Sequence, residues 1–172
     1  MEKIKAYLSG ETISSADSDA FSLYEKSRFG EISGEKIQYS IAESLYLVEK
    51  EKMEVFSNKK KFSKKEFIEK CGKIDKKINV KYPVFKDLRE KGYVIKTALK
   101  FGADFRVYDK GARPGEEHAK WIVFADHESK RLTWHEFSAK NRVAHSTKKN
   151  LLLAIVDEEG DVSYYEVRWI KP

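Results

Sequence analysis

The chain has 172 residues, enough for one domain or two small ones. Charged residues make up 36% of it, and the net charge of +6 favours either a polyanionic partner or simply a lysine-rich surface. A single cysteine, Cys71, excludes an intrachain disulfide framework, and the longest apolar run, Leu151–Val156, is too short to span a bilayer. We therefore expect an intracellular, cytoplasmic protein outside the membrane.

The first half of the chain predicts short strands followed by helices. Apolar and other residues alternate over 4–9, the period of a half-buried strand, and a turn leads to a second short strand at 12–14. Asp17 or Ser18 can cap a helix, which should end by Gly30. Two capping boxes start the next helices. They are Ser40–Glu43 and Ser63–Glu66.

A run of lysines separates these two capping boxes. It follows an asparagine, in the segment Asn58–Lys61. A solvated loop is the favoured interpretation, because lysine-rich segments are usually exposed, and a contact with phosphate is the alternative. The composition alone leaves both open.

The second half predicts mostly strands. Pro83 suits the first position of a helix and Gly92 its stop, which predicts a helix over about 84–91. The predicted strands cover 93–99, 105–108, 120–125, 151–157 and 162–170. One more helix begins at the capping box Thr133–Glu136 and should reach about Thr147.

These elements predict the α/β fold class, as two small α/β domains over 1–82 and 83–172. A helix followed by the continuous apolar run LLLAIV indicates a central strand buried on both faces. The second domain is therefore expected to be a mixed β-sheet flanked by helices.

Three residues of the second half suit RNA cleavage without a metal. RNA carries its own nucleophile, the 2′-hydroxyl, so an enzyme needs a base, an acid for the leaving 5′-oxygen, and positive charge at the phosphate. His118 suits the acid and Lys149 the cation. Tyr108 suits the base if a nearby lysine lowers its pKa from about 10. Each residue alone also has an ordinary explanation, as a packing tyrosine, a solvated histidine or a surface lysine.

The segments around these residues resemble one family. FGADFRVYDKG, RPGEEHAKW, RVAHSTKKNLLLAIVD and DVSYYEVRW are similar to the catalytic half of the archaeal tRNA-splicing endonuclease, over 101–169. The family motif has its lysine three residues after a serine, so Ser146 selects Lys149 rather than Lys148. The N-terminal half resembles the family's smaller domain only in length and in its order of strands and helices.

The resemblance implies roles and a substrate. Tyr108 becomes the general base, His118 the general acid and Lys149 the group that stabilises the transition state. The substrate is precursor tRNA folded as a bulge-helix-bulge, and the products are a 2′,3′-cyclic phosphate and a 5′-hydroxyl. No cofactor and no metal are expected.

The resemblance also implies a grip on a flipped bulge base between two arginines. Arg142 matches the first position, and Arg168 with Trp169 matches the second. Guanidinium planes stack on unpaired bases, which agrees with this role. The alternatives are a helix-surface charge for Arg142 and a core or interface aromatic for Trp169.

An acidic loop joins the last two predicted strands. Its residues are Asp157, Glu158, Glu159 and Asp161, with Gly160 as turn residue. The resemblance implies that this loop inserts into a positive cleft of another subunit. It implies self-association to a homotetramer, or a heterotetramer with a structural subunit. Alternatively, the loop is an ordinary hairpin turn.

Other functions remain open from the residues alone. One is an inactive structural subunit, which the presence of all three catalytic residues disfavours. A second is a basic RNA-binding module, for which His118 is unnecessary. A third is a metal-dependent nuclease based on Asp126, Asp157 and Glu158.

Overall fold

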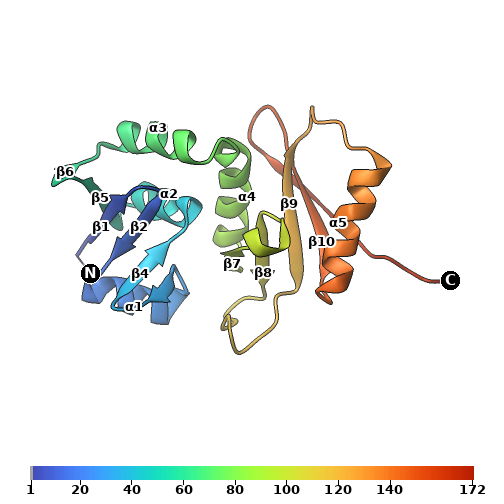
Figure 1. Cartoon of the computed structure of the whole chain (residues 1–172), viewed down its shortest axis with the longest axis horizontal. Coiled ribbons are helices and arrows are strands. Elements are labelled where there is room, and N and C mark those ends of the chain that lie inside the picture. Colours follow the sequence, from blue (N-terminus) through green and yellow to red (C-terminus); the bar gives the residue numbers. More distant parts are fainter. Residues whose placement is uncertain (1) are drawn as a thin grey trace. The chain divides into compact units, whose positions relative to one another are not determined.

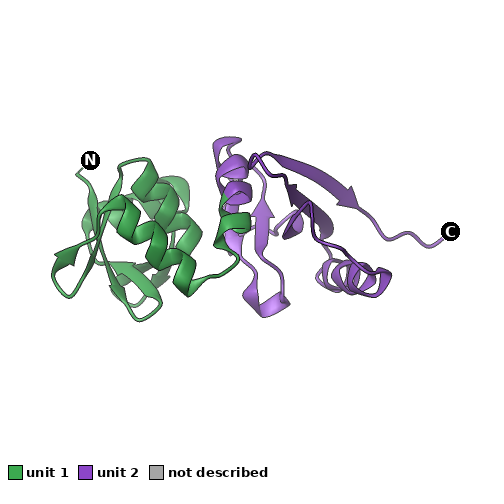
Figure 2. Cartoon of the chain, turned by 90° about the horizontal axis from the view of Figure 1, so that it is seen from above, with its two compact units in different colours: residues 1–82 green, residues 83–172 purple. Residues whose placement is uncertain are grey.

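The computed structural model describes residues 2–172. The chain divides into two compact units, residues 1–82 and 83–172, which Figure 2 distinguishes by colour. Each unit contains a β-sheet and helices (Figure 1), which confirms the expected α/β class. Within residues 2–172 no helix has the length and apolar character that crossing a membrane requires.

Unit 1 is built on a six-stranded sheet with the strand order β3-β4-β2-β1-β5-β6. The strands are β1 (Ile4–Ser9), β2 (Thr12–Ser15), β3 (Glu31–Ser33), β4 (Lys36–Tyr39), β5 (Met53–Ser57) and β6 (Lys60–Lys61). The helices are α1 (Ser18–Ser27), α2 (Ile41–Glu49) and α3 (Lys64–Ile74). The capping boxes at Ser40 and Ser63 both form as predicted. Backbone and hydroxyl hydrogen bonds from Ser63 lower the pKa of Glu66 to about 2.

The segment with three lysines is a tight hairpin. Asn58 and Lys59 have positive φ angles of 48° and 66° and form the turn, and the next two residues pair with β5 as β6. The Lys60 and Lys61 ammonium groups contact the carboxylates of Glu66 at 3.3 Å and Glu54 at 2.6 Å. These lysines are exposed and have protein partners, which favours the interpretation without a phosphate contact.

Unit 2 contains a five-stranded sheet with the order β11-β10-β9-β8-β7. Its elements are β7 (Val94–Thr97), the 3-10 turn η1 (Leu99–Phe101), β8 (Phe105–Tyr108), β9 (Trp121–His127), α5 (Trp134–Ser146), β10 (Asn150–Val156) and β11 (Val162–Val167). β9 and β10 are parallel and the other pairs are antiparallel, so the predicted mixed sheet is confirmed.

Helices pack on the two faces of this sheet (Figure 1). From α4 (Ile78–Glu90), Phe85 packs on Phe105 of β8 with ring centroids 6.0 Å apart. From α5, Ala144 joins a buried cluster with Ile122 and Leu151. The run LLLAIV forms β10, between β9 and β11, and is buried on both faces as predicted, because its first two leucines point to opposite faces and are 0% and 5% exposed.

Two predicted boundaries were wrong. Pro83 lies inside α4, which begins at Ile78, and is not its first residue. A proline costs a helix one backbone hydrogen bond, and burial of Val84, Phe85 and Leu88 on the same helix offsets that loss. The last strand ends at Val167 and not near residue 170, so the residues after it extend beyond the sheet.

Candidate active site

In unit 2, the end of β8 lies at the same edge of the sheet as the starts of β9 and β10. β8 is antiparallel to β9, and β9 is parallel to β10, so β8 ends at the edge where β9 and β10 begin. The register aligns Val107, Trp121 and Asn150 in one row across the sheet. The residues one step beyond this row therefore share one end of the sheet.

Those residues are Tyr108, Lys120 and Lys149. The Lys120 N–H donates to the Val107 carbonyl at 2.8 Å, and the Lys120 carbonyl accepts from Asn150 N–H at 3.1 Å. Lys120 directly precedes β9 and thus lies between the other two. Because neighbouring strands are about 4.8 Å apart, the Cα atoms of Tyr108 and Lys149 are about 10 Å apart.

His118 lies in the loop of residues 109–120, which joins β8 to β9, and its side chain is exposed. The Arg113 carbonyl accepts from the N–H groups of Glu116 and Glu117 at 3.1 and 3.0 Å. The Glu117 carboxylate accepts in return from the Arg113 N–H at 2.9 Å. These bonds fold the loop at its tip, and His118 follows directly, two residues before Lys120.

Tyr108 is the last residue of β8 and is only 4% exposed. It forms a buried cluster with Val94, Ala112 and Ala119. Both alanines belong to the loop that carries His118. The tyrosine therefore anchors this loop to the sheet, and the loop covers the tyrosine.

Lys149 owes its position to the way in which α5 ends. Lys148 has a left-handed backbone with φ 56°, and its N–H donates to the His145 carbonyl at 3.0 Å. The Lys149 N–H donates to the Ala144 carbonyl at 2.9 Å. This pair of bonds is a Schellman motif, which satisfies the last carbonyls of a helix. The Lys149 Nζ atom donates to the Thr147 carbonyl at 3.0 Å, which leaves two of its three protons for other acceptors.

The three residues expected to bind the flipped base lie on α5 and just after β11. Trp169 is 60% exposed, and its ring packs against His145 with centroids 4.4 Å apart. Arg142 is exposed and lies one helical turn before His145, so Arg142 and Trp169 flank the same face of α5. The Arg168 guanidinium forms an ion pair with Glu166 at 2.7 Å.

Sequence reasoning did not single out Lys120, Trp121 or Glu166. The Lys120 Nζ atom lies 4.4 Å from the centroid of the Trp121 ring and 3.9 Å from an Asp109 carboxylate oxygen. The Trp121 indole N–H donates to Glu166 at 2.6 Å. This bond, and then those from Arg168, lower the pKa of Glu166. Lys120 and Trp121 belong to the segment RPGEEHAKW, but the sequence offers no signal for these contacts.

The acidic loop lies between β10 and β11, at the other end of β10 from Lys149. The Asp157 Oδ1 atom accepts from the N–H groups of Glu159 and Asp161, both at 2.9 Å. Asp157 therefore holds the turn together. Glu158, Glu159 and Asp161 are exposed, and the Glu158 carboxylate lies 3.9 Å from the His127 ring.

The acidic residues considered for a metal-dependent nuclease have other partners. Asp126 is 7% exposed, accepts from the Lys130 ammonium at 2.7 Å and lies 3.8 Å from that of Lys140. Asp157 binds backbone N–H groups as described. Within residues 2–172, no three His, Cys, Asp or Glu side chains gather in a way that could hold a metal ion. Asp126 and Asp157 are thus engaged with lysine ammonium and backbone N–H groups.

Comparisons with known proteins cover both units. The family model of the tRNA intron endonuclease catalytic C-terminal domain matches residues 78–164, and that of its N-terminal domain matches residues 4–68. Among curated relatives, the tRNA-splicing endonuclease of Thermococcus kodakarensis is 44% identical over 96% of this chain and 97% of its own length. That of Pyrococcus horikoshii is 44% identical over 98% of this chain and 97% of its own length. That of Nanoarchaeum equitans is 46% identical over 77% and 88%. The similarity thus includes the N-terminal half, whose sequence resembles the family only in its length and in its order of strands and helices.

Proposed function

Because the chain belongs to the tRNA intron endonuclease family, we propose that it excises introns from precursor tRNA by cutting both strands of a bulge-helix-bulge. Family membership supports the coarser function, a tRNA-splicing endonuclease. One observation supports the finer proposal. Tyr108 and Lys149 lie on either side of Lys120 at one end of the unit 2 sheet, and the loop that contains His118 lies at the same end.

The proposed chemistry is a transesterification that needs no water. Tyr108 acts as the phenolate: its oxygen accepts the proton of the 2′-hydroxyl, whose oxygen attacks the adjacent phosphorus. His118 donates a proton to the departing 5′-oxygen, and Lys149 stabilises the added negative charge at the phosphate. The products are a 2′,3′-cyclic phosphate and a 5′-hydroxyl. The Tyr108 side chain packs against Ala112 and Ala119 of the loop of residues 109–120, so the path of this loop fixes where the proposed base lies.

Two other functions receive less support. A plain RNA-binding module does not need an exposed histidine two residues before Lys120, which lies between Tyr108 and Lys149. An inactive structural subunit does not need the complete set of base, acid and cation. All three residues lie at the same end of one sheet, which favours the enzyme.

The test is cleavage of a bulge-helix-bulge RNA in excess EDTA. We expect two cuts, with 3′ fragments that carry a 5′-hydroxyl and 5′ fragments that are one water lighter than a linear phosphate in mass spectrometry. The matched control RNA has a 2′-deoxynucleotide at each cleavage site and should stay intact, because its nucleophile is missing. If cutting stops in EDTA and returns when Mg²⁺ is added, the metal-free mechanism is wrong.

We also propose that the acidic loop joins subunits of a homotetramer; a heterotetramer with an unlike structural subunit is the alternative. The support is the exposure of Glu158, Glu159 and Asp161 at a turn that Asp157 holds in shape. A two-fold assembly with two working sites also suits a substrate that is cut twice.

Neutralising the exposed part of this loop should therefore dissociate the assembly. We expect the triple variant Glu158→Gln, Glu159→Gln, Asp161→Asn to sediment as a species smaller than a tetramer. Asp157 stays unchanged, so the turn keeps its internal hydrogen bonds. The control is Glu35→Gln, an exposed carboxylate in unit 1. An intact tetramer of the triple variant at micromolar concentration refutes the interface.

A further inference from the structure

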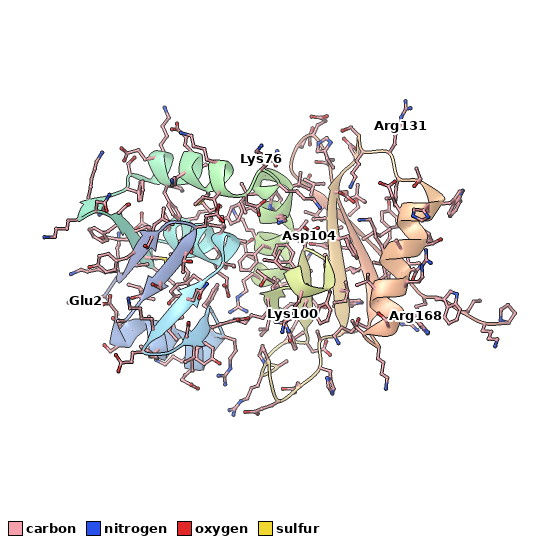
Figure 3. The ribbon with its side chains drawn as sticks, in the orientation of Figure 1. Glu2, Lys76, Lys100, Asp104, Arg131 and Arg168 are labelled. Carbon is pink, nitrogen blue, oxygen red and sulfur yellow. The ribbon has the colours of Figure 1, made fainter. Side chains whose placement is uncertain are left out.

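We propose that Glu166 and Trp121 are positioning residues, which hold the Arg168 guanidinium in the orientation that binds RNA. The inference rests on the proposed role of Arg168 in the grip on the substrate. Figure 3 shows Arg168 near the end of the unit 2 sheet where β10 begins, which is also the end proposed for catalysis.

The contacts form a chain from β9 to the segment after β11. The Trp121 indole N–H donates to Glu166 Oε2 at 2.6 Å. The Arg168 Nε–H donates to Glu166 Oε1 at 2.7 Å, and a terminal guanidinium nitrogen lies 2.7 Å from the same oxygen. Each oxygen of the carboxylate therefore has its own partner. Glu166 links an indole and a guanidinium that are 47 residues apart in the chain.

This geometry fixes one edge of the guanidinium and leaves the rest available. The side chain of Arg168 stays 67% exposed while Glu166 holds its Nε side. Both faces of a guanidinium plane can stack on a base, and its remaining N–H groups can bind phosphate. An arginine that is already ordered loses less conformational entropy when RNA binds.

Trp121 is itself held in place. Its ring packs edge-on against Tyr93, with centroids 5.5 Å apart, and the Lys120 ammonium lies on it at 4.4 Å. It begins β9, directly after the residue that lies between Tyr108 and Lys149. The link through Glu166 therefore ties Arg168 to the strand at the centre of the proposed active site.

Removing Glu166 has opposite expected effects on RNA binding, depending on whether its charge or its contact with Arg168 matters more. Its pKa is lowered, first by the bond from Trp121 and then by that from Arg168, so the group is a carboxylate at neutral pH. A carboxylate beside RNA repels phosphate, and its removal should tighten binding if charge is all that matters. If Glu166 positions Arg168, its removal should weaken binding. The sign of the change separates the two explanations.

The experiment is a double-mutant cycle on the dissociation constant for the uncleavable 2′-deoxy bulge-helix-bulge RNA. We expect Glu166→Ala and Arg168→Ala each to weaken binding about tenfold, because each removes a charge-assisted contact. The double variant should bind no more weakly than Arg168→Ala. Trp121→Phe keeps an aromatic ring at this position but removes the indole N–H, and we expect it to weaken binding less than Glu166→Ala does.

Steady-state cleavage gives the second readout. Loss of positioning should raise KM more than it lowers kcat. Glu166→Gln retains one acceptor oxygen and should therefore recover part of the loss. Tighter binding by Glu166→Ala, or full additivity with Arg168→Ala, overturns the inference while the proposed function stands. Unchanged binding by Arg168→Ala overturns both the inference and the proposed role of Arg168.

Discussion

Replacing His118 with alanine should abolish RNA cutting and leave RNA binding almost unchanged. His118 is the proposed donor of the proton that the leaving 5′-oxygen needs, and loss of a general acid slows such reactions by about 10²–10⁴-fold. The side chain is exposed in a loop, so its removal leaves no cavity in the core. Single-turnover cleavage rates and the dissociation constant for uncleavable RNA measure the two properties separately.

His135→Ala is the matched control. His135 is also exposed and lies in the first turn of α5, whereas Lys149 follows the last turn of that helix. We expect this variant to cut at the wild-type rate. If His118→Ala instead loses binding and cutting together, His118 acts in binding or folding, and the simple RNA-binding module gains support.

Substitution of Lys149 should slow RNA cutting, whereas substitution of its neighbour Lys148 should mainly change the stability of the protein. Lys149→Ala should slow cutting by about 10²–10³-fold, the usual cost of removing one group that stabilises transition-state charge. Lys148 has the left-handed backbone that glycine adopts without strain. Lys148→Gly should therefore raise the free energy of unfolding by about 1 kcal/mol.

Chemical denaturation and single-turnover kinetics on both variants test this assignment. Lys148→Gly should cut within a few-fold of wild type, because its lost charge is only one of the basic groups near the RNA. If Lys148→Gly loses cutting and Lys149→Ala retains it, the catalytic lysine has been assigned to the wrong residue. If neither variant changes the rate, no lysine at this junction stabilises the transition state.

The sequence predicts those elements of the fold whose signals are local. The capping boxes at Ser40, Ser63 and Thr133 each need only four consecutive residues, and all three form. The strands β3, β4, β5 and β6 were not predicted. β3 and β6 are short and exposed and so lack an apolar pattern, whereas β4 and β5 do alternate between buried and more exposed residues but are only four and five residues long. The start of α4 was missed because Pro83 is a stronger local signal than the apolar residues on both sides of it.

In the candidate site, too, the sequence predicts the residues that have local motifs but not the contacts that depend on how distant segments align. Motifs and resemblance to the family predict Tyr108, His118 and Lys149 as site residues. The strand register brings Tyr108 and Lys149 to one end of the sheet, and His118 lies in the loop that starts and ends there. The contact of Trp121 with Glu166 depends on how β9, β10 and β11 align, which no local pattern reveals. The cover over Tyr108 also depends on the path of the loop of residues 109–120.

The most direct test of the acid–base mechanism is the rate of His118→Ala on an RNA with sulfur in place of the leaving 5′-oxygen. A thiol has a pKa of about 8.5, so its thiolate departs without a proton from the enzyme. We predict that His118→Ala cuts this RNA at nearly the wild-type rate, although it fails on the ordinary RNA. An equally large defect on both RNAs would contradict the assignment of His118 as the general acid, and with it the proposed mechanism.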